Sequence, residues 1–330
     1  MKNICVLGSG AWGTAISCVL AENGHSVKIY GIDPTEVADI NDNRRNSKYI
    51  SATIPDGVSA STDFDNAAKG ADIVVLAVPS FAIEDTVLRV LPYLTNDTII
   101  VNLAKGFDEK TKLPLGEVIR QTLPQEKRKN VVSMLGPTFA VEVAEKQFTT
   151  ITASSRCRKT CREVQHIFST PYFRVYVNTD PVGAEYCSAL KNVVAIACGI
   201  ADGLGYKVNT RAALITRGLA EIRGFVKRLG GNESTCYGLT GVGDLTLTCS
   251  SETSRNYAAG VKIGETSFAE FRKTNSKTVE GVFACQIAYE LAEEYDLDAP
   301  IVDFVHAVMH EEKDVKDEFE ILKLRIIGEE

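Results

Sequence analysis

The sequence has no long hydrophobic run, and we expect its first residues to be part of the folded protein rather than a secretion leader. Its longest apolar stretch, residues 193–201, is well short of the ~20 residues that span a bilayer. The N-terminal segment MKNICVLGSG has one lysine, an apolar run too short for a signal peptide, and glycines where a cleavage site would stand. We therefore expect a cytoplasmic protein without a membrane span.

An excess of positive charge is also missing. The chain has 36 basic and 43 acidic residues, which gives a formal net charge of −7. A general nucleic-acid binder would carry a basic surface, so this balance argues against a nucleic-acid partner. A local basic pocket for a small anion remains compatible with it. The composition allows a homodimer but contains nothing that requires one.

Paired cysteines and metal-binding clusters are absent as well. Nine cysteines, an odd number, are scattered along the chain, and only Cys157 and Cys161 lie close in sequence. This pattern indicates reduced thiols rather than a disulfide framework. His306 and His310 could share a helix face, but Ala307 stands where the metalloprotease motif needs glutamate. We predict no metal site.

The first half of the chain alternates short branched apolar runs with helical patterns. Continuous apolar strands separated by helices are typical of a parallel sheet covered on both faces, so we predict a Rossmann-like, doubly wound α/β fold. One such helical pattern covers residues 14–23, ending at Gly24, and another covers residues 81–94. The predicted strands are residues 3–8, 27–30, 71–79, 97–104, 130–136, 149–154 and 172–178.

The second half has long helical periodicities, and strand signals largely stop after residue 178. We predict a dinucleotide-binding domain over residues 1–182 and an all-helical substrate-binding and catalytic domain over residues 183–330. Because no Gly/Ser-rich linker separates them, we expect tight packing with a cleft. The charged segment 311–330 is interpreted as a solvated terminal helix or tail.

A glycine-rich turn directly follows the first predicted strand. In GSGAWG, the glycines are Gly8, Gly10 and Gly13. The pattern is weak in isolation, but between a strand and a helix it predicts a dinucleotide site. Glycines let the backbone approach a pyrophosphate, whose charge is received by amides and the positive end of the helix. The alternative is a glycine turn packed without a ligand.

The end of the second strand distinguishes NAD from NADP, because an acidic residue there binds the ribose hydroxyls and repels a 2′-phosphate. Here Gly31 takes the usual acidic position and is followed by Ile32 and Asp33. Arg44 and Arg45 could reach a 2′-phosphate, although an exposed helix face explains them equally well. We therefore predict NAD(P)H as the cofactor without choosing between its two forms.

Three charged residues interrupt apolar context. Lys105 in NLAKGF follows a predicted strand, where such folds place ligands. Lys191 lies in the helical stretch ALKNVVAIACGIAD, and Asp244 in GLTGVGDLTLTC. A buried lysine with a shifted pKa could act as an acid/base, oriented by a carboxylate. The alternatives are a surface lysine whose stem covers apolar neighbours, and an aspartate that caps a helix.

Two further segments suit an anion. CSSETSRN, residues 249–256, ends in Ser254, Arg255 and Asn256, and arginine with hydroxyl and amide donors suits a phosphate. Ser254 as a plain helix cap is the alternative. GPTFA, residues 136–140, is a strand end followed by a helix start and offers amide donors.

In this order, GSGAWGTA, NLAKGF, LGPTFA, ALKNVVAIACGI, GLTGVGDL and TSRN closely resemble the bacterial-type NAD(P)-dependent glycerol-3-phosphate dehydrogenases. The resemblance covers nearly the whole chain. It implies a Rossmann domain followed by a helical domain, and the interconversion of sn-glycerol 3-phosphate and dihydroxyacetone phosphate. In bacteria the family supplies the glycerol phosphate backbone of phospholipids.

The resemblance also implies roles for individual residues. Lys191 resembles the catalytic proton donor/acceptor and Lys105 the lysine shared by substrate and cofactor. Asp244 matches a substrate-binding position, and we place it with the two lysines in the catalytic set. Asn192 is expected to be a second polar contact beside Lys191. The other substrate positions are Gly136, Thr138, Ser254, Arg255 and Asn256. The other cofactor positions are Ala11, Trp12, Ala140, Arg255, Val279 and Glu280.

One position departs from the family pattern. Many bacterial members have Arg or His where this chain has Ile32, and that residue can meet the 2′-phosphate of NADP. A related enzyme class, the β-hydroxyacid-type dehydrogenases, also joins a Rossmann domain to a helical domain and uses a helix lysine followed by asparagine. A non-catalytic NAD(H)-sensing module is the alternative from another class.

Overall fold

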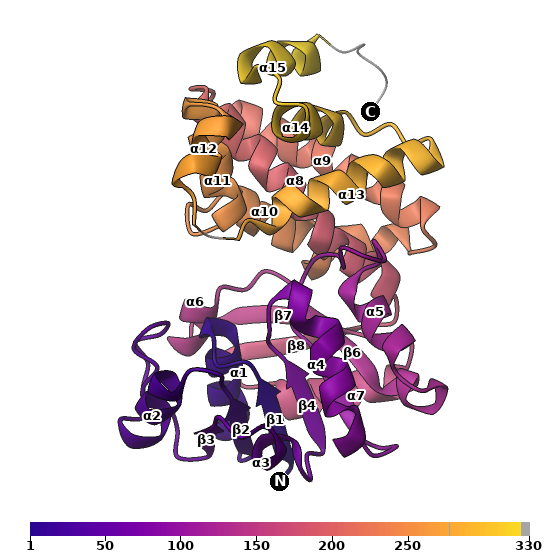
Figure 1. Ribbon diagram of the computed structural model, residues 1–330. Coiled ribbons are helices and arrows are strands. Elements are labelled where there is room, and N and C mark those ends of the chain that lie inside the picture. The colour runs from indigo at the N-terminus through magenta and orange to yellow at the C-terminus, as the bar shows by residue number, and fades with distance from the viewer. Residues whose placement is uncertain (277, 325–330) are drawn as a thin grey trace. The chain divides into compact units, whose positions relative to one another are not determined.

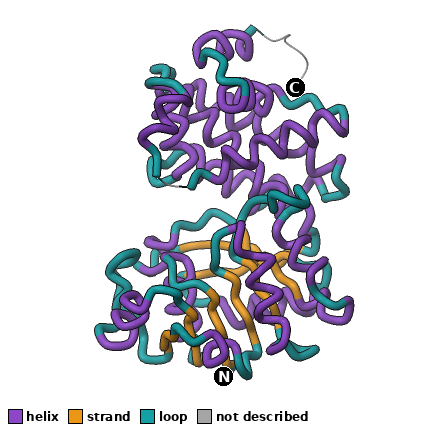
Figure 2. Tube along the Cα trace, viewed as in Figure 1, coloured by secondary structure: helices purple, strands orange, loops and turns teal. Residues whose placement is uncertain are grey.

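The computed structural model describes residues 1–276 and 278–324 and divides into two compact units, Met1–Pro181 and Val182–Glu330. Every strand of the described chain belongs to the first unit, whereas the second is built from helices (Figure 2). Residues 325–330 of the charged C-terminal segment lie outside the described residues; just before them, Val315–Lys323 form a helix, α15.

The first unit contains an eight-stranded sheet in the order β3-β2-β1-β4-β5-β6-β7-β8 (Figure 1). Neighbours from β3 to β6 pair in parallel, β7 runs antiparallel to β6, and β8 is parallel to β7. The strands are β1 (Asn3–Leu7), β2 (Ser26–Tyr30), β3 (Val58–Ser61), β4 (Ile73–Leu76), β5 (Ile99–Asn102), β6 (Val131–Leu135), β7 (Thr149–Ser154) and β8 (Phe173–Asn178).

Alternate residues of the central strands enter two hydrophobic layers. In β1, Ile4 and Val6 pack with α1 and α7 on one face, whereas Cys5 and Leu7 pack with α4 and α5 on the other. Because both faces are covered, the strands read as continuous apolar runs. The helices of this unit are α1 (Ala11–Glu22), α2 (Pro34–Asp42), α3 (Phe64–Ala68), α4 (Ile83–Val90), α5 (Leu115–Thr122), α6 (Ala140–Ala144) and α7 (Arg158–Phe168).

The predicted fold class is confirmed, with two local differences. The sequence analysis missed β3, whose segment VSAS is short and half serine and so lacks an apolar run. It also placed β7 in a parallel sheet, whereas β7 is reversed against β6. Strand direction depends on the path of the connection, which apolar patterning does not encode.

The second unit is organised around α8 (Pro181–Gly203). This helix is long and apolar enough to cross a membrane, but its most apolar window is 100% buried, as expected for the core helix of a compact unit. A Cβ on Gly199 of α8 would lie 2.1 Å from the carbonyl oxygen of Tyr257, and one on Gly260 would lie 2.2 Å from that of Ile196. Glycine therefore lets α8 and α11 touch at the backbone. The other helices are α9 (Val208–Arg228), α10 (Asp244–Cys249), α11 (Arg255–Glu265), α12 (Phe268–Thr274), α13 (Glu280–Tyr295) and α14 (Pro300–His310).

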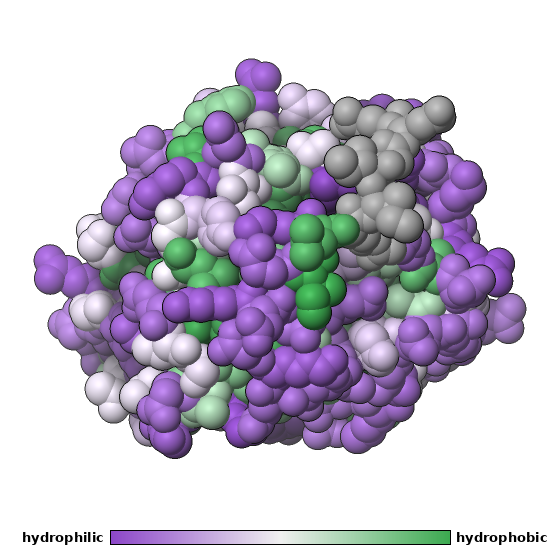
Figure 3. Space-filling view, turned by 90° about the horizontal axis from the view of Figure 1, so that it is seen from above, coloured by the Kyte–Doolittle hydropathy of each residue, from purple (hydrophilic) through white to green (hydrophobic). Residues whose placement is uncertain are grey.

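The surface near α15 is mainly hydrophilic. Figure 3 shows this face, with hydrophobic side chains in small separate groups among hydrophilic ones. Single exposed apolar residues such as Ile321, 62% exposed, are ordinary on a folded protein.

Candidate active site

The glycine-rich turn lies at the carboxyl edge of the parallel strands. Gly8 follows β1, has a φ of +117° and donates its N–H to the carbonyl of Tyr30 at 2.9 Å. A Cβ on Gly8 would lie 2.5 Å from the Ala77 carbonyl oxygen, and one on Gly13 would lie 2.1 Å from that of Gly8. Both positions therefore need glycine to close the turn against β4.

Gly10 is different, because a Cβ there would meet no described atom within 4 Å. It is the N-cap of α1, and within the described chain no side chain caps this helix end and no acidic residue lies in its first turn. The first amides of a helix have no intrahelical acceptor and carry the positive end of the helix dipole. The turn thus offers amide donors and open space to an anion.

Two other predicted cofactor positions lie near this turn. Trp12 is in the first turn of α1, and its ring contacts Phe173 of β8 with centroids 6.4 Å apart. Ala140 begins α6, which packs against α1. Trp12 and Ala140 both pack on the same hydrophobic core, which holds the turn in position.

The end of β2 carries Ile32, whose side chain is 83% exposed. Asp33 follows and caps α2, its Oδ1 accepting the Thr35 N–H at 2.9 Å. Arg44, which the sequence analysis considered for a 2′-phosphate, instead bonds to the backbone in this structure. Its guanidinium donates to the carbonyls of Ile54 at 3.2 Å and Val58 at 2.8 Å.

Lys105 lies in the loop that follows β5, next to the end of β6. The Asn102 side chain shapes this loop by bonding both the N–H and the carbonyl of Ala104, each at 3.0 Å. Lys105 is half-buried, and its Nζ donates to the Gly136 carbonyl at 3.0 Å. The Thr138 hydroxyl donates to the same carbonyl at 3.4 Å. The structure thus brings together three residues that the sequence analysis assigned to substrate.

In the second unit, Lys191 and Asp244 form a buried ion pair. Lys191 Nζ lies 2.5 Å from Asp244 Oδ1, and the two side chains are 6% and 1% exposed. Nζ also donates to the Thr248 hydroxyl at 2.8 Å, which donates in turn to the Asp244 carbonyl at 2.6 Å. The surface-lysine alternative for Lys191 is therefore wrong, and the Asp244 side chain is committed to the lysine.

The sequence analysis did not assign a role to Thr248. Lys191 is on α8, while Asp244 and Thr248 are one turn apart on α10. A spacing of four residues on a helix places two side chains on one face, so once Asp244 is chosen the pattern D-x-x-x-T points to Thr248. That signal is weak without the structure, because threonine is common on helices.

The surroundings of the ion pair are largely uncharged. Burial raises the pKa of the Cys249 thiol well above its usual range, and a hydrogen bond with Cys198 adds to the effect, so this thiol is neutral. Asn192 is 3% exposed and follows Lys191 on α8. A low-dielectric wall of this kind strengthens electrostatic interactions near the ammonium.

The predicted phosphate cluster lies at the start of α11. The Ser254 hydroxyl accepts the Tyr257 N–H at 3.3 Å, so Ser254 is a helix cap, as its alternative reading proposed. Asn256 Oδ1 accepts the Gly281 N–H at 2.9 Å, and exposed Arg255 donates to the Thr278 carbonyl at 3.2 Å. These bonds bring the segment with Val279 and Glu280 to the same place as Ser254–Asn256.

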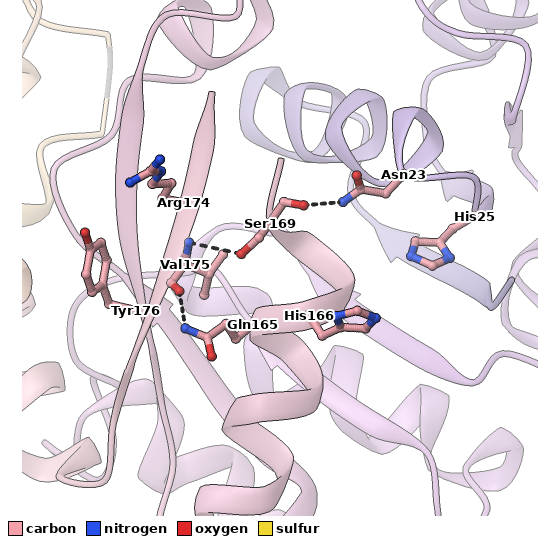
Figure 4. A pocket seen from close by; sticks show the side chains of 8 residues that line it. All are labelled: Asn23, His25, Gln165, His166, Ser169, Arg174, Val175 and Tyr176. Atoms are coloured by element: carbon pink, nitrogen blue, oxygen red, sulfur yellow. Dashed lines mark hydrogen bonds between the residues drawn. The ribbon is translucent and has the colours of Figure 1, made fainter. Parts of the chain in front are cut away.

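A cavity of about 700 Å³ in the first unit is a separate feature (Figure 4). It lies beside Asn23, at the far end of α1 from the glycine turn. Its polar side chains serve the fold: Asn23 donates to the Ser169 carbonyl at 2.9 Å, and Gln165 donates to the Val175 carbonyl at 2.6 Å. None of the predicted site residues lines it. Among the described residues, no group of three or more His, Cys, Asp or Glu side chains could hold a metal ion.

A glycine turn at the carboxyl edge of a parallel sheet, with a lysine–aspartate pair buried in a helical unit, defines the class of NAD(P)-dependent dehydrogenases with a Rossmann domain and a helical domain. Comparison with known families narrows this class. The family models described as NAD-dependent glycerol-3-phosphate dehydrogenase N-terminus and C-terminus match residues 3–161 and 180–320. The chain belongs to the NAD-dependent glycerol-3-phosphate dehydrogenase family.

Individual relatives agree with this assignment. The chain is 40% identical over 328 residues to a glycerol-3-phosphate dehydrogenase [NAD(P)+] of Bacillus velezensis, covering 99% of this chain and 95% of that one. It is 43% identical to an enzyme of the same name from Clostridium botulinum, covering 98% of each. The solved glycerol-3-phosphate dehydrogenase of Coxiella burnetii superposes with a TM-score of 0.89 at 32% identity, covering 98% of this chain and 99% of that one.

Proposed function

We propose that this chain is an NAD(P)-dependent sn-glycerol-3-phosphate dehydrogenase, which reduces dihydroxyacetone phosphate to sn-glycerol 3-phosphate in a reversible reaction. Its product supplies the backbone of glycerophospholipids. The observation that carries the proposal is the buried Lys191–Asp244 pair, with Nζ and Oδ1 2.5 Å apart, in a chain that also has a dinucleotide-type glycine turn.

The residues of the turn fit a dinucleotide. Gly8 and Gly13 hold the backbone in a shape that a side chain would prevent, and the space beside Gly10 is open to a pyrophosphate. The first amides of α1 supply its hydrogen-bond donors. When bound, NAD(P)H supplies the hydride that reduces the ketone carbon. We assign Ala11, Trp12, Ile32, Ala140, Val279 and Glu280 to the cofactor site on the family resemblance.

The charged residues handle the proton and the charge. Lys191 Nζ donates a proton to the ketone oxygen as it becomes a hydroxyl, and Asp244 holds the ammonium in place. Lys105 polarises the carbonyl, because a cation near the oxygen stabilises the charge that develops there. Gly136, Thr138 and Asn192 are assigned to further substrate contacts.

The phosphate is assigned to the start of α11. Arg255 offers a planar guanidinium, and Ser254 and the helix end contribute polar groups. Asn256 uses its Oδ1 acceptor on Gly281, so its Nδ2 donors are the part of the side chain that suits a phosphate. Arg255 also serves the cofactor on the family resemblance.

In this assignment residues 1–182 bind most of the cofactor and supply Lys105, whereas residues 183–330 carry Lys191, Asp244 and the phosphate-binding groups and add a few cofactor contacts. A cytoplasmic location and a homodimeric assembly belong to the same proposal. Sedimentation analysis of the purified protein tests the assembly.

The decisive experiment follows the absorbance of NADH and NADPH after dihydroxyacetone phosphate is added to purified protein. We expect steady oxidation of the cofactor. Dihydroxyacetone without its phosphate should react with a kcat/KM lower by at least about two orders of magnitude, because binding energy from the phosphate contributes to the transition state.

Two other results would contradict the proposal. Turnover of a β-keto acid without phosphate, but not of dihydroxyacetone phosphate, would favour a β-hydroxyacid-type dehydrogenase. Cofactor binding without turnover of either substrate would favour an NAD(H)-sensing module. Each result also leaves a distinct pattern of cofactor binding and turnover, so the alternatives are separable in one set of assays.

A further inference from the structure

The side chain of Lys48 lies beside Asp33, just after the end of β2, although the sequence immediately around Ile32 and Asp33 contains no cation. Lys48 Nζ is 2.7 Å from Glu36 Oε1 and 3.8 Å from Asp33 Oδ2. The Lys48 side chain is 58% exposed, so its ammonium reaches solvent beside the first turn of α2. Asp33 is the residue that follows Ile32, and Ile32 brings no charge to this position.

This place matters for the choice of cofactor. In a Rossmann fold the adenosine ribose lies at the end of the second strand, where a carboxylate accepts the 2′-hydroxyl and a cation accommodates a 2′-phosphate. Gly31, the last residue before Ile32, lies close to the glycine turn: a Cβ there would be 2.7 Å from the Ser9 hydroxyl. The end of β2 therefore packs directly against the glycine turn.

Two other nearby cations, Arg44 and Lys28, bond to groups away from Asp33. Arg44 bonds two backbone carbonyls, and its Nε lies 3.7 Å from Asp56. Lys28 on β2 donates to the carbonyl and the Oδ1 of Asn66. Arg45 is exposed, and its charge adds to the hydrogen bonds from Ser47 and Asn43 that lower the pKa of the Asp39 carboxyl, further along α2. Lys48 is thus the cation that the described structure places beside Asp33.

Both carboxylates near Lys48 are ionised. The Thr35 N–H at the start of α2 holds the pKa of Asp33 below its usual range. Burial alone would raise the pKa of Glu36, but hydrogen bonds from Lys48, Ser9 and Tyr49 lower it below the usual range. Two negative charges and one positive charge lie together here, so loss of the Lys48 charge would leave two carboxylates without their shared cation.

We propose that Lys48 is the ligand of the 2′-phosphate of NADPH and determines how well NADPH competes with NADH for this site. The inference rests on the proposed function, because it assumes a dinucleotide on the glycine turn. The exposed ammonium turns from Asp33 to the phosphate, while its bond to Glu36 keeps its stem beside α2.

The test measures cofactor binding in the full-length protein without turnover. Trp12, the single tryptophan of the chain, lies in the glycine turn and reports binding by its fluorescence. Lys48→Met keeps the apolar stem and removes the charge. We expect the Kd for NADPH to rise about tenfold, which corresponds to one charge-assisted hydrogen bond, and the Kd for NADH to change by less than about twofold.

Two matched variants sharpen the result. Lys48→Arg keeps the charge and should retain NADPH affinity within about threefold. Asp33→Asn keeps an N-cap side chain but removes a negative charge, so the Kd for NADPH should fall severalfold. If Lys48 only steadied Glu36 and Ser9, Lys48→Met would weaken NADH and NADPH equally, and the inference would be wrong. Failure of the unmodified protein to bind either cofactor would instead overturn the proposed function, and this inference with it.

Discussion

The two groups of candidate site residues, one in each unit, are built by different means. The glycine turn offers backbone amides from one six-residue stretch and has open space beside Gly10. The proposed acid/base group is instead a buried network of side chains. It joins Lys191 to Asp244, which is 53 positions away in the sequence, and to Thr248, which is 57 positions away. A backbone site tolerates most side-chain changes but not an added Cβ, whereas a buried charge network tolerates the loss of none of its members. Substitutions in the glycine turn should therefore do harm by adding atoms, whereas substitutions in the buried network should do harm by removing a charged or polar group.

The largest effect is expected at Lys191. Lys191→Met removes the proton donor, and because general acid catalysis contributes about 10²–10⁴-fold, kcat should fall at least about 10³-fold. Cofactor binding, measured by Trp12 fluorescence, should remain. The variant also leaves Asp244 charged and buried, which costs about 3–5 kcal/mol of stability. Steady-state kinetics and thermal unfolding measure the two effects.

A double variant and a surface lysine serve as controls. Lys191→Met with Asp244→Asn removes the uncompensated charge, so stability should recover while activity stays lost. Lys227 is 71% exposed, and its Nζ lies 3.2 Å from Glu233 Oε1. This surface ion pair is the control for the buried pair of Lys191 and Asp244. Lys227→Met should leave turnover unchanged. Near-normal turnover in Lys191→Met would remove the lysine from the mechanism.

In the glycine turn, two substitutions of the same kind should give different results. A Cβ on Gly13 collides with the Gly8 carbonyl, so Gly13→Ala should lower the free energy of unfolding by about 1–3 kcal/mol or more. Gly10 has a φ of −68° and open space, so Gly10→Ala should fold normally. Its methyl group enters the proposed pyrophosphate site and should raise the Kd for NADH by about tenfold or more.

Thermal unfolding and fluorescence titration of the two variants decide this prediction. Gly10→Ala separates binding from folding, which Gly13→Ala cannot do. Unchanged NADH affinity in Gly10→Ala would mean that the pyrophosphate does not approach this amide. The assignment of the pyrophosphate to the glycine turn would then be wrong, while the role proposed for Lys191 would be unaffected.

The same contrast explains what the sequence could predict. The central strands and the glycine turn depend on local patterns, such as the buried run of β4 and the six residues from Gly8 to Gly13, so the sequence predicted where they lie in the chain. The reversal of β7 depends on how its connection crosses the sheet. The pair of Lys48 with Asp33 was missed because the two residues meet only after α2 turns the chain back, which no local motif records.

Thr248 shows the same limit in the second unit. The contact between Lys191 and Asp244 requires α8 and α10 to pack together, and the sequence supplied only the two charged residues and a family resemblance. Glycines that bring α8 against α11 are visible in the sequence as Gly199 and Gly260, but the backbone contact they allow is not. A hydroxyl residue such as Thr248, which bonds to a buried charge, is therefore hard to predict from sequence patterns.

Thr248 also gives the smallest expected effect. Thr248→Val keeps the shape of the side chain and removes the acceptor of the Lys191 N–H, a bond to a charged group worth about 1.5–3 kcal/mol. We expect kcat to fall about tenfold, with the KM for dihydroxyacetone phosphate and the Kd for NADH nearly unchanged. Thr248→Ser keeps the hydroxyl and should restore most of kcat. If the serine variant were as slow as the valine variant, the methyl group and its packing would be the contribution of Thr248. The network would then reduce to the Lys191–Asp244 pair alone.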